Sequence, residues 1–399
     1  MMPAVSTQGA TAIFWLAAGA CLYAWVIFPL LLHLKACKRA PSAPPSGPLG
    51  PMADWPSVSV VIAAHDEVHT LPAKLSSLAA LDYPTALCEW VIVSDGSTDG
   101  TAELLERAGH REPRLKESHY PEAAGKPTAL NAAVSQACGD ILVFMDARQQ
   151  VGVDALRALV ATLQDDSIGA ASGELTLAAD EGGDAGNVGL YWRYEKWIRQ
   201  NESRLFSTTG ATGALWAMRR KDWVPLPADA LLDDFDTPVR LLARGLRTVF
   251  VPQAQVFDQA EASGRGEFRR KCRTLAGNFQ SFARHPWLFD PRRNPVWWQF
   301  LSHKVARLLA PYAMMAALLS AALGGLAGDS TLLRAMLALQ LTFYALGAAA
   351  LLGWQNRLSR FAGVFLQMNA AAVVGAWRWL SGTGSVRWKR AAPLEKGER

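Results

Sequence analysis

Three short apolar runs in the chain each end at polar residues that include an acid. They are Val58–Ala64 before His65-Asp66-Glu67, Trp90–Ser94 before Asp95, and Ile141–Phe144, which ends just before Asp146. Apolar runs of this length without alternation are typical of strands buried on both faces. Ligands of open α/β sheets bind beyond the carboxyl ends of the strands, so the three ends predict one ligand-binding edge. Any one end is explained equally well as an ordinary turn, but all three together favour a site.

Helical patterns alternate with these strands. Helices are expected over residues 71–80 and 101–108, and a further strand over 247–251. This βαβ rhythm predicts an α/β fold with a mixed, mostly parallel sheet, in a soluble domain that covers residues 57–260. The turn DGSTDGT at 95–101 can hold an anionic or sugar ligand near backbone N–H groups. The motifs GxGxxG and GxxxxGK[ST] do not occur, so dinucleotide and P-loop sites lack their required residues.

Two charged features lie outside the strand ends. Lys126, in GKPTALN, places a cation between the second and third acid-tipped strands, where Lys is a usual phosphate partner. LLDDFD at 231–236 places Asp233, Asp234 and Asp236 within four positions. Like charges this close raise one another's pKa. The cluster is either a solvated helix start, where acids favour the helix dipole, or a catalytic site.

The amino-terminal region, residues 1–40, predicts an uncleaved membrane anchor. From Thr11 to Leu34 no residue other than His33 can carry a charge near neutral pH, and this length spans a bilayer as a helix. Lys35, Lys38 and Arg39 follow, so the positive-inside rule puts the amino terminus outside and the next domain in the cytoplasm. Residues 41–56 are rich in proline and are expected to form a semi-rigid linker.

The cysteines and the net charge limit the kinds of binding site and partner that are expected. The five cysteines are scattered and lack CxxC spacing, so neither disulfides nor a structural zinc site is expected. The net charge of +5 is placed beside apolar segments, which indicates a membrane surface rather than a nucleic-acid partner.

The carboxyl-terminal part also carries membrane signals. Basic and aromatic residues at helical spacing over 268–282 predict an amphipathic interfacial helix within residues 261–303. Apolar segments at 305–327, 332–353 and 361–380 predict a membrane region over residues 304–381, before a basic tail at 382–399. Four spans would leave this tail outside, whereas its Lys and Arg residues indicate the inside. We therefore expect the last segment, 361–380, to be re-entrant or interfacial.

Several of these motifs, taken in order, resemble one family. VVIAAHDE (60–67), VSDGSTD (93–99), GKPTALN (125–131), the acid Asp146, Asp233-Asp234 and RKCRT (270–274) are similar to elements of membrane-integrated family 2 glycosyltransferases. These enzymes, which include bacterial polysaccharide synthases, have a GT-A catalytic domain, a Rossmann-like α/β fold, with transmembrane helices at both ends of the chain. The resemblance covers nearly the whole sequence.

The resemblance implies roles for particular residues. Asp234 would be the general base, and Asp146 would be the first acid of the metal-binding DxD motif, holding Mg²⁺ or Mn²⁺ through diphosphate oxygens and water. Arg148 stands where the second acid of that motif usually lies, and Thr274 replaces a tryptophan of processive synthases. The nucleotide sugar would be contacted by residues from five parts of the chain: Ala64, Glu67, Asp95, Lys126, Asp146, Arg270 and Arg273.

The implied activity is inverting transfer of a sugar from a nucleotide-diphosphate donor, expected to be a UDP-sugar, to an acceptor at the bacterial inner membrane. The acceptor is a lipid-linked saccharide or a growing polysaccharide, and both remain open. This interpretation also predicts a multi-pass protein with a cytoplasmic catalytic domain and with membrane lipids as partners. No nucleic-acid partner is expected, and homo-oligomerisation is left open. The alternative is a non-catalytic scaffold or nucleotide-sensing module that retains the fold; the presence of Asp95, Asp146 and Asp234 favours the enzyme.

Overall fold

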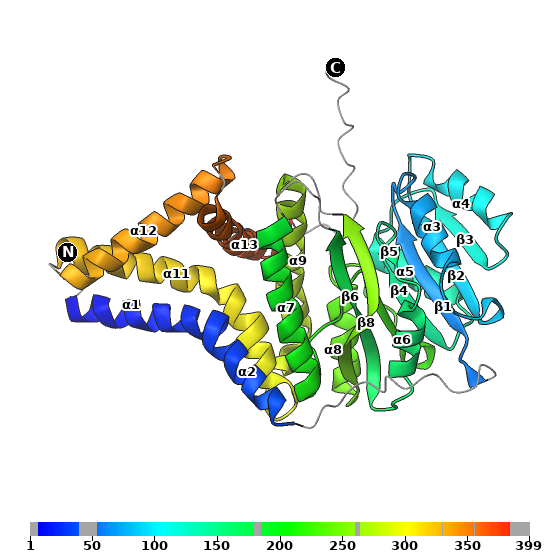
Figure 1. Cartoon of the computed structure of the whole chain (residues 1–399), viewed down its shortest axis with the longest axis horizontal. Helices are drawn as coiled ribbons and strands as arrows, with labels where there is room; N and C mark the ends of the chain where they lie inside the picture. The colour runs from blue at the N-terminus through cyan, green and yellow to red at the C-terminus, as the bar shows by residue number, and fades with distance from the viewer. Residues whose placement is uncertain are drawn as a thin grey trace, which may run out of the picture.

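The computed structural model describes residues 7–39, 54–178, 185–259, 264–328, 330–354 and 356–383. Most of the predicted linker (41–56) and most of the predicted basic tail (382–399) lie outside the described residues. The rest of the chain divides into an α/β domain, at the right of Figure 1, and a group of long helices at its left.

The α/β domain is built on one eight-stranded sheet with the order β3-β2-β1-β4-β7-β6-β8-β5. Strands β3, β2, β1 and β4 are parallel, β7 runs antiparallel to β4 and β6, β6 and β8 are parallel, and β5 is antiparallel to β8. The strand bounds are β1 Val58–Ala64, β2 Cys88–Asp95, β3 Leu115–Tyr120, β4 Ile141–Met145, β5 Gln150–Val151, β6 Ile168–Ala178, β7 Leu215–Arg219 and β8 Arg247–Gln259. The predicted α/β class with a mixed, mostly parallel sheet is confirmed.

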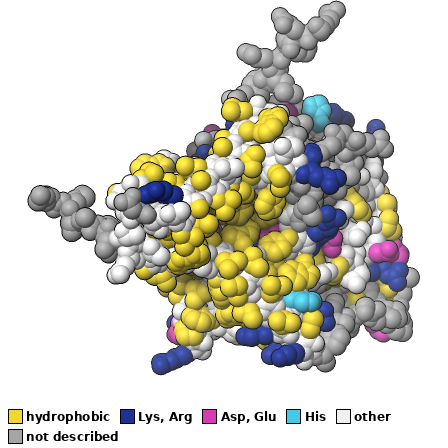
Figure 2. All heavy atoms as spheres, turned by 60° about the vertical axis from the view of Figure 1, so that its left-hand side comes forward, with side chains coloured by type: hydrophobic (Ala, Val, Ile, Leu, Met, Phe, Trp, Pro, Cys, Tyr) yellow, Lys and Arg dark blue, Asp and Glu magenta, His cyan; other side chains and the backbone are white. Residues whose placement is uncertain are grey.

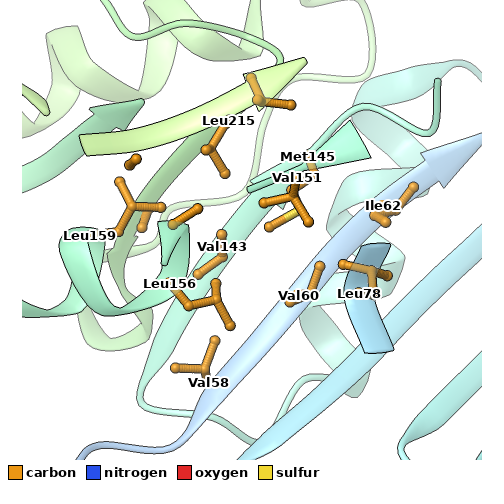
Figure 3. Packing of buried hydrophobic residues seen from close by; sticks show 14 of the residues in the cluster. Val58, Val60, Ile62, Leu78, Val143, Met145, Val151, Leu156, Leu159 and Leu215 are labelled. Atoms are coloured by element: carbon orange, nitrogen blue, oxygen red, sulfur yellow. The ribbon is translucent and has the colours of Figure 1, made fainter. Parts of the chain in front are cut away.

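Helices cover both faces of the sheet. On one face lie α3 (Leu71–Ala79), α4 (Thr101–Gly109) and α6 (Ala155–Thr162), and on the other lie α5 (Lys126–Gln136) and α8 (Asp233–Ala243). Figure 3 shows the first core, where Val60 and Ile62 of β1 lie beside Leu78 of α3, and Val143 of β4 lies beside Leu156 of α6. Three short 3₁₀ turns join these elements, at Thr85–Leu87, Arg220–Asp222 and Pro286–Phe289.

Strands β3, β5, β6 and β7 were not expected from the sequence. β3 is an edge strand in which only Leu115 is buried, so it carries no apolar run. β7 inserts antiparallel between β4 and β6, and Trp216 of β7 stacks on Phe144 of β4 at a ring-centroid distance of 4.2 Å. This pairing joins residues more than 70 positions apart, and no local sequence pattern encodes it.

Four helices are long and apolar enough to cross a membrane: Thr7–Cys37, Trp297–Ala327, Thr331–Leu351 and Arg357–Leu380. The first combines α1 (Thr7–Leu22), a π-helical turn η1 (Tyr23–Ile27) and α2 (Phe28–Cys37). The second combines α10 (Trp297–Gln299), η6 (Phe300–Val305), α11 (Ala306–Ala322) and η7 (Leu323–Ala327); α12 (Thr331–Leu351) and α13 (Arg357–Leu380) follow. These helices indicate membrane association.

The outer surface of these helices is apolar. Figure 2 shows hydrophobic side chains gathered over this face, with Lys and Arg mainly toward its margins. Exposed residues include Leu16, Leu319, Leu326 and Leu339, which a water-soluble surface would bury. The face therefore fits a lipid environment.

Two long helices join the membrane helices to the sheet. They are α7 (Ala185–Leu205), which packs against α2, and α9 (Gly264–Arg284), which packs along α13 (Figure 1). The helix expected at 268–282 thus forms, with wider bounds. α13 contacts this helix as well as α12, and its expected re-entrant or interfacial position stays a prediction.

A buried lysine lies beneath the strand ends. Lys74 of α3 is fully buried and donates a hydrogen bond from Nζ to the Gln149 carbonyl oxygen at 2.8 Å. Burial lowers the pKa of Lys74 to about 7, against an opposing effect of Asp146. The side chain fixes the backbone just beyond Asp146.

This pKa predicts a pH dependence of stability. Between pH values of about 10 and 7 the unfolded chain binds the Lys74 proton and the folded chain does not, so stability falls as the pH falls through this window. Lys74→Met removes this contribution, and the difference in thermal midpoint between pH 9.5 and pH 7 becomes smaller. Differential scanning fluorimetry of the detergent-solubilised chain measures it, with exposed Lys221→Met as the control. An unchanged difference in Lys74→Met would contradict the prediction.

Candidate active site

The turns after β1 and β2 are tied together at the predicted edge. His65 Nδ1 lies 2.6 Å from the Asp95 carbonyl oxygen, and the Thr98 N–H donates to Asp66 Oδ1 at 2.7 Å. Asp66 has a φ of 55°, in the left-handed region. The DGSTD turn is therefore held by the HDE turn, as adjacent parallel strands allow.

Asp95 positions the loop that precedes α5. Its side chain is fully buried and accepts hydrogen bonds from the N–H groups of Ala124 and Gly125, each at 2.7 Å. Gly96 permits this approach, because a Cβ there would lie 2.2 Å from the Ala123 nitrogen. Asp95 thereby sets the start of α5 and the place of Lys126. Its predicted contact with a nucleotide stays a prediction.

Lys126 joins two acidic segments that are far apart in the sequence. Its Nζ lies 3.0 Å from Asp146 Oδ1, after β4, and 3.2 Å from Asp233 Oδ1, at the start of α8. Burial opposes the charged form of Lys126, but Asp146, Asp233 and Asp234 outweigh it and raise its pKa. Lys126 is therefore a permanent cation at the centre of three carboxylates.

Asp234 has the properties of a base. Burial and the neighbouring Asp233 raise the pKa of Asp234 to about 6, although Lys126 and Arg199 act in the opposite direction. A carboxylate with this pKa is ionised near neutral pH and accepts a proton more readily than an ordinary aspartate.

The small-residue loop at 207–215 lies directly against this base. The Ala211 N–H donates to the Asp234 carbonyl oxygen at 2.7 Å, and a Cβ on Gly213 would lie 2.9 Å from Asp234 Oδ2. On the far side, Arg199 of α7 donates to Thr212 Oγ1 at 2.7 Å. The loop thus places residues with little or no side chain between Asp234 and α7.

With this geometry established, the chain was compared with known proteins. The model of the family described as Glycosyl transferase family 2 matches residues 59–223, which contain β1 to β7. The chain contains a family 2 glycosyltransferase domain. The predicted family is therefore confirmed, and the domain is that of a transferase.

Relatives agree with this assignment. An N-acetylglucosaminyltransferase of Mesorhizobium japonicum is 31% identical over 240 residues, which are 53% of this chain and 52% of that protein. One from Rhizobium meliloti is 29% identical, over 56% of each protein. A Synechocystis beta-monoglucosyldiacylglycerol synthase is 32% identical over 37% of this chain and 32% of its own. The chain thus spans about half the length of the first two relatives.

The fold itself extends beyond the glycosyltransferase domain. A mannosyltransferase of Pyrobaculum calidifontis, solved with GDP-Man and Mn²⁺, superposes with a TM-score of 0.73 at 24% sequence identity. The superposition covers 94% of this chain and 98% of that one, so it includes the membrane helices. The predicted GT-A domain with apolar helices on both sides is confirmed as a fold.

The metal position of the glycosyltransferase domain departs from the usual motif. Asp146 contacts Lys126 through Oδ1, and its side chain is partly exposed. Arg148, in the second motif position, pairs with Asp258 of β8 at 2.6 Å, and Gln149 binds the same oxygen at 3.0 Å. Among the described residues no group of three acidic, His or Cys side chains could hold a metal ion. The residues fit a metal held by one carboxylate, with diphosphate and water supplying the rest.

The other predicted nucleotide contacts lie at different places. Ala64 ends β1 and is buried, and Glu67 is the last residue of the HDE turn, where burial raises its pKa despite a hydrogen bond from Thr70. Arg270 and Arg273 are exposed on α9. Their contact with the diphosphate stays a prediction.

Three relevant contacts were missed by sequence reasoning. Asp233 of the predicted acidic cluster pairs with Lys126, Asp258 neutralises Arg148, and Arg199 lies beside the small-residue loop at 207–215. The adjacent acids Asp233-Asp234 were a visible signal for the first. The other two depend on pairings of β8 and α7 with distant segments, which the sequence does not display.

The raised pKa of Asp234 predicts an acid limb in the pH profile. Because the base must be ionised, kcat/KM should fall below a pH of about 6, whereas an ordinary aspartate would hold it constant to about pH 4. Steady-state turnover of the sugar nucleotide from pH 4.5 to 8 measures this. A profile flat down to pH 5 would exclude Asp234 as the titrating base.

Removing Lys126 should move this limb. Lys126 lowers the pKa of Asp234, so Lys126→Met leaves three carboxylates without their central cation and shifts the acid limb to higher pH. Lys126→Arg keeps the charge and is the matched control, with a limb near the wild-type position. If Lys126→Met retained the wild-type limb, the cation would not be coupled to the base.

Proposed function

We propose that the protein is an inverting, membrane-associated glycosyltransferase whose general base is Asp234. The observation that carries this proposal is a partly buried aspartate of raised pKa, which lies against a loop of small residues beside a lysine-bridged pair of acids. Such a base is ionised near neutral pH and can take the proton of an acceptor hydroxyl.

The donor proposed is a nucleotide-diphosphate sugar, with a UDP-sugar as the first choice. The turn at 95–101 and the lysine-bridged acids lie at the carboxyl edge of the sheet, where α/β domains bind nucleotides. Two named N-acetylglucosaminyltransferase relatives support a sugar donor. The acceptor is a saccharide, lipid-linked or part of a growing polysaccharide.

The reaction is a direct displacement. The acceptor oxygen attacks the anomeric carbon, the bond from that carbon to the diphosphate oxygen breaks, and the hydroxyl proton passes to Asp234. The nucleoside diphosphate leaves with the bonding electrons, and attack on the opposite face inverts the anomeric configuration. Lys126 holds Asp146 and Asp233 in place and offsets negative charge at the donor site.

Asp146 is the residue that would hold Mg²⁺ or Mn²⁺ here. The metal would neutralise charge on the departing diphosphate.

The cellular setting follows the membrane helices. We place the protein at the bacterial inner membrane as a multi-pass protein with its transferase domain on the cytoplasmic side, because Lys35, Lys38 and Arg39 follow the first span. Membrane lipids then surround the apolar face of Figure 2. Homo-oligomerisation remains a prediction without a test in the structure.

Nucleoside-diphosphate release tests the function. Full-length protein in detergent should release the nucleoside diphosphate from one member of a panel of UDP-sugars, with Mg²⁺ or Mn²⁺ and membrane lipid extract present. Asp234→Asn should lower the rate by about 10²- to 10⁴-fold, the usual contribution of a general base. Asp166→Asn, at a side chain that is 98% exposed, is the matched control and should keep wild-type activity.

The thermal midpoint of each variant shows whether it is folded. Equal rates in wild type and folded Asp234→Asn would remove Asp234 from the mechanism. No release from any UDP-sugar would favour another nucleotide donor or, failing GDP-sugars as well, the non-catalytic scaffold.

A further inference from the structure

A cavity of about 180 Å³ lies between the membrane helices and the transferase domain. Residues of η1, α7, α9, η6, α11 and α13 line it, so three of the four candidate spans meet α7 and α9 there. In Figure 1 this is the region where α7, α9 and α13 come together, between the sheet and the long helices. A ligand that reaches this cavity can come from the membrane.

The lining is rich in cations. It contains Arg199, Lys271, Lys304 and Arg307, together with His303, whereas Glu195 is the one acid among the lining residues. Glu195 is itself neutralised, because it pairs with Arg307 and lies 3.3 Å from His303 Nε2. Arg199, Lys271 and Lys304 thus outnumber the acids of the lining, and Glu202 lies behind it, 2.8 Å from His303 Nδ1.

The lining also carries donors without acceptors. Trp25 Nε1 and the Nε and Nη2 groups of Arg307 are buried and have no hydrogen-bond partner in the described part of the chain. Lys304 likewise forms no ion pair or hydrogen bond with the described residues. Buried donors without partners cost about 1–3 kcal/mol each, which a ligand with several acceptor oxygens would recover.

Apolar and aromatic groups complete the cavity. Lys271 lies over the rings of Tyr191 and Trp192, at 5.7 and 5.3 Å from their centroids. Leu308, Met368 and Ala372 come from the membrane helices. The lining therefore suits a ligand with an anionic head and an apolar remainder.

The cavity is next to the proposed base. Arg199 lines it and also donates to Thr212 Oγ1, the residue before Gly213, which contacts the Asp234 carboxylate. The charge of Arg199 is felt at Asp234, where it lowers the pKa against the raising effect of burial. A molecule held in the cavity thus has its head within reach of the small-residue loop.

We propose that this cavity binds the phosphate group of a membrane lipid, and that this phosphate-bearing lipid is the acceptor. The statement that this lipid is the acceptor rests on the proposed function, whereas the lipid-phosphate binding site does not. Arg199, Lys304 and Arg307 hold the phosphate oxygens, the aromatic rings and α13 contact the apolar part, and the acceptor hydroxyl reaches Asp234. A neutral saccharide would not balance the excess of positive charge in the lining, so the lining disfavours it as the occupant.

Binding without any sugar donor tests the site. Full-length protein in detergent is titrated with radiolabelled dodecyl phosphate, and dodecanol and inorganic phosphate serve as separate competitors. Dodecyl phosphate should bind, inorganic phosphate should compete weakly, and dodecanol should compete least. Equal competition by dodecanol would overturn the proposal, because a pocket that binds only the alkyl tail would explain that result. Inorganic phosphate competing as well as dodecyl phosphate would overturn the lipid part.

Lys304→Met is the decisive variant, because Lys304 makes no hydrogen bond or ion pair with the described residues, although the charges of Glu202 and Glu195 act on it. Losing one charged hydrogen bond to phosphate should weaken binding about tenfold or more. Lys221→Met removes one exposed lysine in the 3₁₀ turn Arg220–Asp222 and is the matched control, with unchanged affinity. Wild-type affinity in a folded Lys304→Met protein would overturn the proposal.

Asp234→Asn separates this site from the transferase reaction. It should bind dodecyl phosphate as tightly as wild type while losing sugar transfer. If no donor sugar is ever turned over but Lys304 still controls dodecyl phosphate binding, the proposed function fails and the lipid-phosphate site stands. Loss of dodecyl phosphate binding in folded Asp234→Asn would contradict a site centred on the cavity.

Discussion

The charge balance around Lys126 is the interaction on which the site depends. Asp146, Asp233 and Asp234 approach one another at a buried position, where three uncompensated carboxylates would repel strongly. The lysine ammonium lies within 3.2 Å of Asp233 and 3.0 Å of Asp146, so it binds the end of β4 to the start of α8. The same cation keeps the pKa of Asp234 from rising further than about 6. One residue therefore connects the fold of the edge with the reactivity of its base.

The position of Lys126 depends in turn on Asp95. Both oxygens of this buried carboxylate accept N–H groups from the loop before α5, and Gly96 allows the loop to approach without a side chain. The acids at the ends of the strands thus divide into two kinds. Asp95 acts on the backbone, whereas Asp146 and Asp234 remain close enough to Lys126 to share its charge. The reactive groups at this edge of the sheet therefore depend on a structural carboxylate, Asp95, at the end of β2.

The membrane helices contribute more than an anchor. They place Trp25, Lys304 and Arg307 beside α7 and α9, and Arg199 connects this cation-rich cavity with the loop that covers Asp234. A transferase whose base lies next to a membrane-side cavity can take its acceptor from the lipid phase and its donor from the sheet edge. The two ligands would then meet at Asp234 from opposite sides of the loop.

The sequence by itself determined the strands that end in acids, the βαβ order, the family and the apolar helices, because each of these is written in local periodicity or in contiguous motifs. It also indicated Asp146, Asp234 and Lys126 individually. Only the tertiary structure decided that Lys126 joins Asp146 to Asp233, that Arg148 is neutralised by Asp258, and that Arg199 faces the base. These contacts join segments up to 110 residues apart through β7, β8 and α7. Their pairing comes from burial and charge balance in three dimensions, which no local pattern records.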